Sequence, residues 1–283
     1  MQTKTFAPTA PKFTKLQDLA VVFQNGTKLE ILAGLSAFKV SEAFAGKKGW
    51  FKAFCKLEDL AKTGAPQFKI FAKGNSKLPF FAFSTLPGVS CPGAGDCIDF
   101  CYSYRAWRYP SAFARMAQNA FLLRFNQPAI SSSLAAIPGA YDLRLYVDGD
   151  FSSIGDCVFW MNELANNPHV NAYGYSKSFA VLLAYNLIGK WPANYLLNIS
   201  SGHNASAQMV DYVRALPITR GEFVAVKIGF KPVHGSVETN NAIRAQFEEK
   251  IFPCPGQCGA CTGAGHACGM PKMKNRIIAI AIH

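Results

Sequence analysis

Long apolar segments are scarce in this chain of 283 residues. The longest apolar run, FAVLLAYNLIG at 179–189, is too short to cross a bilayer and predicts a buried helix instead. The first residues, MQTKTFAPTAPKFTKL, carry charge but lack the apolar core of a secretory signal peptide. We therefore expect a soluble cytoplasmic protein that does not have a membrane as its partner.

Several catalytic signatures are also absent. The sequence has no Gly-x4-Gly-Lys-Ser/Thr phosphate loop, no His-Glu-x2-His helix and no Gly-x-Ser-x-Gly elbow. It has no His-hydrophobic-His pair of the kind that relaxases and rolling-circle nickases use. These absences exclude the motif-bearing members of the corresponding enzyme classes.

Acidic residues are few, and the chain is strongly basic. It has 29 Lys and Arg against 17 Asp and Glu, a formal net charge of +12. Such a surplus is typical of proteins that meet phosphate, so we expect a nucleotide or nucleic acid as partner. In SYRAWRYP at 103–110, Arg105 and Arg108 flank Trp107, a pattern that suits stacking on unpaired bases. A packed aromatic turn before a helix is the alternative.

Strand-like and helix-like segments alternate through most of the chain. The predicted strands are 68–75, 78–85, 141–150, 170–178, 195–202, 222–230 and 276–283. The predicted helices are 40–62, 110–126, 153–167, 179–189, 206–217 and 239–252. Short connections between them indicate parallel βαβ units.

The alternation predicts an α/β fold: a partial or complete (β/α) barrel over residues 67–283, with an open doubly wound sheet as the alternative. Residues 1–66 are expected to form an N-terminal arm, at 1–12, and an α-rich extension. The barrel-like domain includes a Cys-rich, metal-binding segment at 254–268.

Polar residues stand where the predicted strands end. Because the carboxyl ends of parallel strands share one edge, these residues should meet there. We expect Ser153, Ser178 and Ser206 to serve only as helix N-caps. The candidate catalytic residues are Asp148, Asp150, Lys177 and His203, and the candidate cofactor-binding residues are Asp148, Gly149, Asp150 and Ser176.

The chain has nine cysteines, an odd number, and the reducing compartment expected for it argues against a disulfide framework. Cys55 and Cys157 stand alone in apolar helical segments and are predicted to be packed thiols. Three others, Cys91, Cys97 and Cys101, share the loop CPGAGDCIDFCY directly after a predicted strand. Three thiols in one Gly-rich loop suit an iron–sulfur cluster with one open iron, or zinc with a fourth ligand from elsewhere.

A second cysteine cluster lies in CPGQCGACTGAGHAC. Its candidate metal ligands are Cys254, Cys258, Cys261, His266 and Cys268, and zinc and iron–sulfur both fit. In strict βα order this cluster lies on the face opposite the first, which makes two sites. If the last strand departs from that order, the two clusters converge.

The segments CPGAGDCIDFCYSYRAWRYPSAFARMAQNAFLLR, LRLYVDGDFSS and WMNELANNPHVNAYGYSKSF resemble the phage and plasmid gene product 88 family. The resemblance covers roughly residues 80–268, with Asp148 where the family pattern has Ser and Ser176 where it has Thr. It implies a mobile-element origin, and hence a host cytoplasm, more firmly than a mechanism.

A weaker similarity is to radical S-adenosylmethionine enzymes, which carry three cysteines after the first strand of a partial barrel. Phe100 before Cys101 fits that pattern, and Asp148 to Asp150 fall where such enzymes grip the cofactor. The spacing of the first loop differs from their common Cys-x3-Cys-x2-Cys form.

Three functions remain. The first is an iron–sulfur enzyme resembling the radical S-adenosylmethionine class, acting on a nucleotide or nucleic acid. The second is a zinc-bearing base-modifying enzyme of the glycosyl-transfer type. The third is a nucleic-acid-binding protein without catalysis, with a structural metal.

Overall fold

The computed structural model describes residues 14–73, 78–258, 261–262 and 266–282, so the arm predicted at 1–12 lies outside the described residues. Its helices are α1 (Thr14–Asn25), α2 (Lys28–Val40), α3 (Lys48–Thr63), α4 (Pro110–Phe125), α5 (Gln127–Ala135), α6 (Ile154–Asn166), α7 (Phe179–Ile188), α8 (Ala207–Arg214) and α9 (Val237–Arg244). Its strands are β1 (Ala72–Lys73), β2 (Phe81–Ala82), β3 (Tyr141–Leu145), β4 (Val170–Ser176), β5 (Tyr195–Ser200), β6 (Thr219–Val226), β7 (Phe252–Pro253) and β8 (Ile278–Ala281).

The strands form one open sheet in the order β1-β2-β3-β4-β5-β6-β8-β7. Only the β1–β2 pair is antiparallel among the described strands. The α/β class and the parallel strands are therefore confirmed. The described strands do not close into a complete barrel, because β1 and β7 are left as two separate edges.

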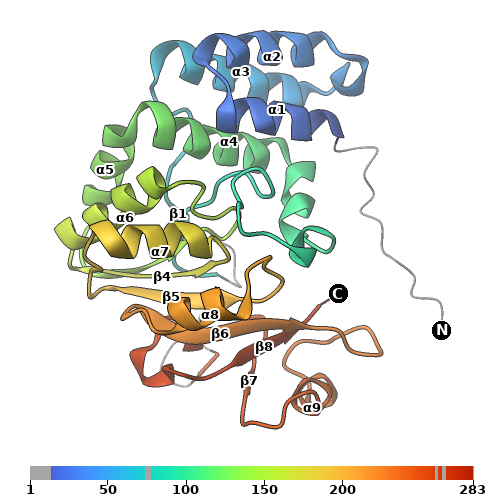
Figure 1. The fold of residues 1–283 in the computed structure, drawn as a ribbon. Coiled ribbons are helices and arrows are strands. Elements are labelled where there is room, and N and C mark those ends of the chain that lie inside the picture. Colours follow the sequence, from blue (N-terminus) through green and yellow to red (C-terminus); the bar gives the residue numbers. More distant parts are fainter. Residues whose placement is uncertain (1–13, 74–77, 259–260, 263–265, 283) are drawn as a thin grey trace.

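Helices cover one face of the sheet (Figure 1). Since β2 to β6 follow one another in sequence order, right-handed crossovers place their connecting helices on the same side. Leu143, Ala172 and Leu197 point to that side and share one apolar cluster with α4, α6 and α7. The cluster continues into α1, α2 and α3, which stack beyond α4.

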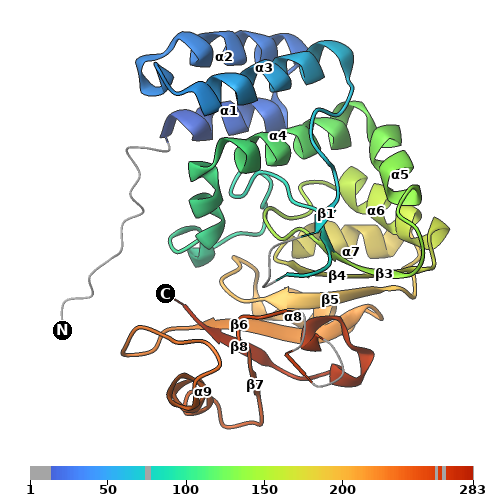
Figure 2. The ribbon, with the colours of Figure 1, turned by 180° about the vertical axis from the view of Figure 1, so that it is seen from behind.

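The described part of the second cysteine segment lies against the opposite face (Figure 2). Tyr173 and Tyr175 of β4 point to that side, where they pack with Ala267, Cys268 and Ile278. Of the two arrangements that the sequence left open, the last strand departs from strict βα order: β8 lies between β6 and β7, and β7 pairs with β8. Between β7 and β8 the chain therefore crosses the face of the sheet opposite the helices, instead of adding each new strand at the outer edge of the sheet.

A buried arginine fastens this segment to the sheet. Arg220 is fully buried; its Nε donates to Asn198 Oδ1 (2.6 Å), and its terminal nitrogens donate to the carbonyls of Met273 (3.0 Å), Arg276 (2.8 Å) and Glu222 (3.0 Å). These four bonds use all three nitrogens of the guanidinium, and four of its five N–H donors, without a carboxylate partner.

Asn198 extends the same network. Its Nδ2 donates to Gly174 O (3.0 Å) and to Cys268 O (3.1 Å). We call Arg220 and Asn198 the arginine hub. It joins strands β4, β5 and β6 to the segment that carries Cys268.

We expect Arg220→Ala to lower the free energy of unfolding by about 3 kcal/mol, because it leaves the buried Asn198 Oδ1 and three partly buried carbonyls without this donor. Denaturant titration measures this. Arg214→Ala is the control: Arg214 is half exposed and bridges Asp211 and Glu222 at the surface, so its loss should cost under about 1 kcal/mol. Equal losses for the two variants would contradict the role of the hub.

Candidate metal centre

The first cysteine loop lies directly on the carboxyl ends of β4 and β5. Gly95 N and Cys97 N both donate to Gly202 O (3.0 and 3.3 Å), and Ala94 forms an antiparallel bridge with His203. A Cβ on Gly93 would stand 1.7 Å from Lys177 O, so only glycine allows this approach. The predicted meeting of the loop with the strand ends is therefore present.

The three thiols of this loop have the chemistry of soft-metal ligands. Cys91, Cys97 and Cys101 are partly exposed and carry no disulfide. Burial raises the pKa of Cys91 to about 12, with the charge of Asp150 adding to the effect, and burial also raises the pKa of Cys97. A bound cation would supply the positive charge that favours thiolates.

The donor types therefore fit a metal, but the side chains do not stand ready around one. Among the described residues, no group of three or more His, Cys, Asp or Glu side chains is placed to hold an ion. Binding at this loop would require the thiols to turn toward a common centre.

Asp150 organises the strand ends beside the loop. Its carboxylate is buried and accepts four hydrogen bonds: Oδ1 from Phe151 N and Ser176 Oγ (both 2.8 Å), and Oδ2 from Lys177 N (2.7 Å) and Ser178 N (3.2 Å). These donors occupy the usual acceptor capacity of a carboxylate. Burial raises the pKa of Asp150, and these hydrogen bonds oppose the rise. The predicted catalytic and cofactor-binding roles of Asp150 and Ser176 stay predictions, beside this positioning role.

The same network corrects one predicted cap. Ser153 and Ser206 accept from backbone N–H groups at the starts of α6 and α8, as expected. Ser178 precedes α7 but makes no side-chain cap, and its backbone N–H is directed to Asp150 instead.

Lys177 and His203 lie together at this edge. Lys177 Nζ donates to Ser200 Oγ (2.7 Å), and the His203 ring packs 4.8 Å from the ring of Phe179. Burial, and then the charge of Lys177, lower the pKa of His203. With Nδ1 accepting from Ala205 N (3.2 Å), the neutral ring carries its proton on Nε2 and can donate it.

Asp148 points into a different space. With Gly256 and Cys258 of the second cysteine segment it lines a cleft of about 510 Å³ that Tyr102, next to Cys101, also borders. Both cysteine segments therefore reach one cleft. Burial raises the pKa of Asp148, while hydrogen bonds from Ser103 and Ser84 and the charges of Arg144 and Arg115 lower it.

Hydrogen bonds to the backbone hold two cysteines of the second segment. Cys254 N donates to Ala279 O (2.7 Å), and Cys261 Sγ accepts from Ala267 N (3.1 Å). Burial raises the pKa of Cys254 to about 11, an effect to which Cys258 and Cys261 add, and that of Cys268 to about 12. Cys254, Cys258 and Cys261 also show the Cys-x3-Cys-x2-Cys spacing that the first loop lacks, a signal that the sequence prediction missed.

His266, the fifth predicted ligand, is used for packing. Its buried ring lies between Phe80 (4.7 Å) and Tyr173 (4.6 Å), and its Nδ1 is 3.8 Å from Asp142 Oδ2. Burial lowers its pKa, and the charge of Asp142 opposes this. Asp142 is at the amino end of β3, whereas Asp148 follows the carboxyl end, so His266 lies away from the cleft.

A family model described as gene product 88 matches residues 54–269, which is more than half of the chain. The chain belongs to the gene product 88 family. No curated protein and no solved structure matches it.

The matched region of this gene product 88 protein contains both cysteine segments, the Asp150 network and most of the cleft lining. The same comparison lends no support to the weaker similarity to radical S-adenosylmethionine enzymes. No helix among the described residues is long and apolar enough to span a membrane.

The predicted base-stacking residue is not available on the surface of this family member. Trp107 is fully buried and packs edge-on against Tyr104 (5.1 Å) and Phe113 (5.3 Å). The prediction that Trp107 stacks on bases is therefore wrong, and the alternative of a packed aromatic turn is confirmed. Arg108 remains exposed, and Arg105 is exposed as well.

The two lone cysteines differ from each other. Cys157 is buried, as the packed-thiol prediction requires, whereas Cys55 is partly exposed on α3. Burial raises the pKa of Cys157 to about 12, so this thiol stays protonated in the apolar core. Neither residue belongs to a cysteine segment.

Sequence reasoning also missed three residues of the cleft: Asn119, Arg115 and Arg144. Arg144 could have been singled out from the sequence, because it is a charged residue within the apolar strand LRLYV. Charged residues in such strands are rarely buried without a partner. Asn119 and Arg115 lie in α4, and only the packing of that helix beside β2 and β3 brings them here.

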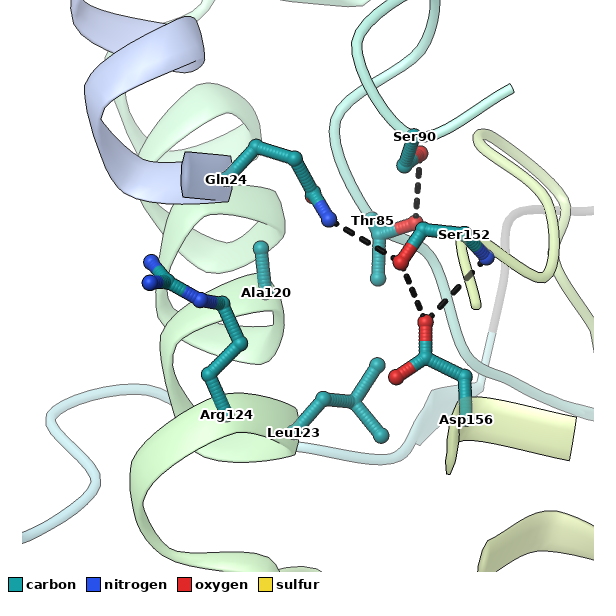
Figure 3. Close-up of a pocket in the computed structure, with 8 residues that line it drawn as sticks. All are labelled: Gln24, Thr85, Ser90, Ala120, Leu123, Arg124, Ser152 and Asp156. Atoms are coloured by element: carbon teal, nitrogen blue, oxygen red, sulfur yellow. Dashed lines mark hydrogen bonds between the residues drawn. The ribbon is translucent and has the colours of Figure 1, made fainter. Parts of the chain in front are cut away.

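A much smaller cavity of about 10 Å³ is lined by Gln24, Ser152, Asp156 and their neighbours (Figure 3). It offers the room of about one water molecule. Gln24 of α1 donates to Ser152 Oγ (3.0 Å), which in turn donates to Asp156 (2.5 Å). Burial raises the pKa of Asp156, and the bonds from Ser152 and Ser153 oppose this. The N-terminal helices are thus linked to the turn that follows Asp150.

Gly149 lets the chain turn between the two aspartates. Its φ is +81°, and a Cβ would stand 2.1 Å from Thr85 Oγ1 and 2.7 Å from Ser90 Oγ. The neighbouring side chains leave no room for any residue but glycine. The cofactor contact predicted for Gly149 stays a prediction beside this backbone role.

We expect Gly149→Ala to be more destabilising than Gly139→Ala. Gly139 has a similar φ of +73° but open space around its Cβ, so Gly139→Ala should cost about 1 kcal/mol, the strain of the left-handed conformation. Gly149→Ala adds overpacking, roughly 1–3 kcal/mol more. Thermal and denaturant unfolding of the two variants measure the difference. Equal losses would show that the Thr85 contact imposes no constraint.

Proposed function

We propose that this protein is a metal-dependent enzyme of a mobile genetic element, with an iron–sulfur cluster held by Cys91, Cys97 and Cys101, that acts on a nucleotide or nucleic acid. The observation that carries the proposal is the position of the thiol loop. Three free thiols lie on the carboxyl ends of parallel strands, the edge at which such folds place their chemistry. When bound, a cluster with three cysteine ligands supplies one-electron chemistry at its open iron.

The polar residues beside the loop have distinct tasks in this proposal. Lys177, fixed by Ser200, places a positive charge next to Cys97 and favours its thiolate. His203 offers a proton at Nε2 toward a substrate at this edge. Asp150 holds the backbone of Lys177 in position. S-adenosylmethionine as a second cofactor, contacting Asp148, is the finer form of the proposal.

Zinc is the second candidate metal. Four cysteines in the second segment, Cys254, Cys258, Cys261 and Cys268, match a structural zinc set, and backbone hydrogen bonds fix Cys254 and Cys261. A zinc enzyme that modifies bases, with Asp148 or Asp150 as nucleophile or base, would use the same strand edge.

A binding protein without catalysis is the third candidate. It would rest on the net charge of +12 and on the exposed side chains of Arg105 and Arg108. In that case the metal would serve only to hold a cysteine segment in its fold.

The test is iron, zinc and acid-labile sulfide content, with an absorption spectrum, on protein purified without oxygen. We expect iron with sulfide in the wild type. Cys97→Ala should lose the iron and sulfide that the first cysteine loop binds. Cys258→Ala, in the second segment, should leave that amount of iron and sulfide unchanged.

Cys55→Ala is the matched control, since Cys55 lies on α3 in neither cysteine segment and its loss should leave the metal content unchanged. Zinc without sulfide would overturn the iron–sulfur form in favour of the zinc enzyme. Protein without any metal would overturn both metalloenzymes and favour a binding protein.

A further inference from the structure

The cleft of about 510 Å³ has a size typical of small-molecule sites. Its walls come from four parts of the chain: the β1–β2 region, η4 (Tyr102–Arg108) after the first cysteine loop, α4, and the end of β3. Gly256 and Cys258 add the second cysteine segment. No sequence motif predicted this site.

Positive charge dominates the lining. Lys73, Arg115 and Arg144 contribute three cations, and Asp148 is the single carboxylate among the lining residues that the structure describes. Arg144 is held with its guanidinium 4.6 Å above the ring of Tyr175, an arrangement that orients the group and shields one face. Such a cluster favours an anionic ligand.

Two buried polar atoms in the lining lack partners among the described residues. Arg144 Nε is a donor without an acceptor, and Asn119 Oδ1 is an acceptor without a donor. Asn119 is 1% exposed, and its other end is fixed because Nδ2 donates to Ser84 O (2.9 Å). Buried polar groups are normally paired, so unpaired ones require an explanation. A ligand with both an anionic acceptor and a neutral donor would satisfy both.

We propose that the cleft binds a nucleoside monophosphate, with the phosphate on Arg115 and Arg144 and a donor of the nucleoside on Asn119 Oδ1. Tyr102 presents an aromatic ring at the rim, 59% exposed, with its hydroxyl donating to Val147 O (3.1 Å). That ring offers a stacking surface for the base. Tyr102 directly follows Cys101 in the chain. The role of the ligand as a substrate rests on the proposed function, whereas its binding does not.

Isothermal titration of the purified protein with the four common nucleoside 5′-monophosphates, the matching nucleosides and inorganic phosphate tests the proposal. We expect at least one monophosphate to bind, and its nucleoside to bind about tenfold or more weakly. Arg144→Met and Arg115→Met should each weaken the monophosphate by about ten- to a hundredfold. Arg244→Met, which removes an exposed arginine of α9 outside the cleft lining, is the control and should bind as the wild type does.

Arg115→Met, at a partly exposed position of α4, keeps the test valid if Arg144→Met fails to fold. Unchanged binding in Arg115→Met, equal binding of nucleoside and monophosphate, or no binding of any monophosphate would overturn the proposal. A 5′-phosphorylated oligonucleotide that binds more tightly than every mononucleotide would overturn the mononucleotide form and assign the phosphate to a nucleic acid end.

Cys97→Ala separates this proposal from the proposed function. It should bind the monophosphate as the wild type does. Nucleotide binding by protein that holds no metal would support the nucleotide site in the cleft and contradict the proposed metalloenzyme. Metal binding without nucleotide binding would support the metalloenzyme and contradict the nucleotide site.

Discussion

The carboxylate of Asp150 is the constraint on which the rest of this site depends. Its four hydrogen bonds fix the turn after β3 against the turn after β4. The backbone of Lys177, held in that way, is the surface on which Gly93 and the first cysteine loop lie. A shift of the carboxylate would therefore move the first cysteine loop, Lys177 and the first turn of α7 together. Full pairing of its acceptors offsets the cost of burying the group.

A second buried polar group plays the corresponding part on the other side of the sheet. The arginine hub holds the segment around Cys268 against β5 and β6, whereas Asp150 holds the end of β4, on which the first cysteine loop lies. The two cysteine segments are thus fixed independently, each by its own buried anchor. Both cysteine segments reach the cleft, because Tyr102 of the first segment and Gly256 and Cys258 of the second line it.

The strands and helices from β3 to α8 could be predicted from local periodicity. Each strand there is a short apolar or aromatic segment between polar turns, which makes it recognisable in the sequence. The prediction lost accuracy where pairing is not local. In the described parts of the segments expected as strands at 68–75 and 78–85, β1 and β2 have two residues each, because among those described residues only these pair in the sheet. Strand β6 begins earlier than expected, since Arg220 resembles a surface residue until its buried partners are known. The strand-end residues could be named from the sequence, but the cleft could not, because Arg115 and Arg144 meet only in three dimensions.

The place of β8 also bears on the order in which the molecule can be made. Strand β7 pairs with β8, and β8 is synthesised after the whole second cysteine segment. At ordinary rates of translation the intervening residues take on the order of seconds to appear. During that interval Cys254 cannot dock on the sheet, because Ala279, whose carbonyl accepts the hydrogen bond from Cys254 N, has not yet been added. The docking of the second cysteine segment is therefore among the last steps in the assembly of the described sheet.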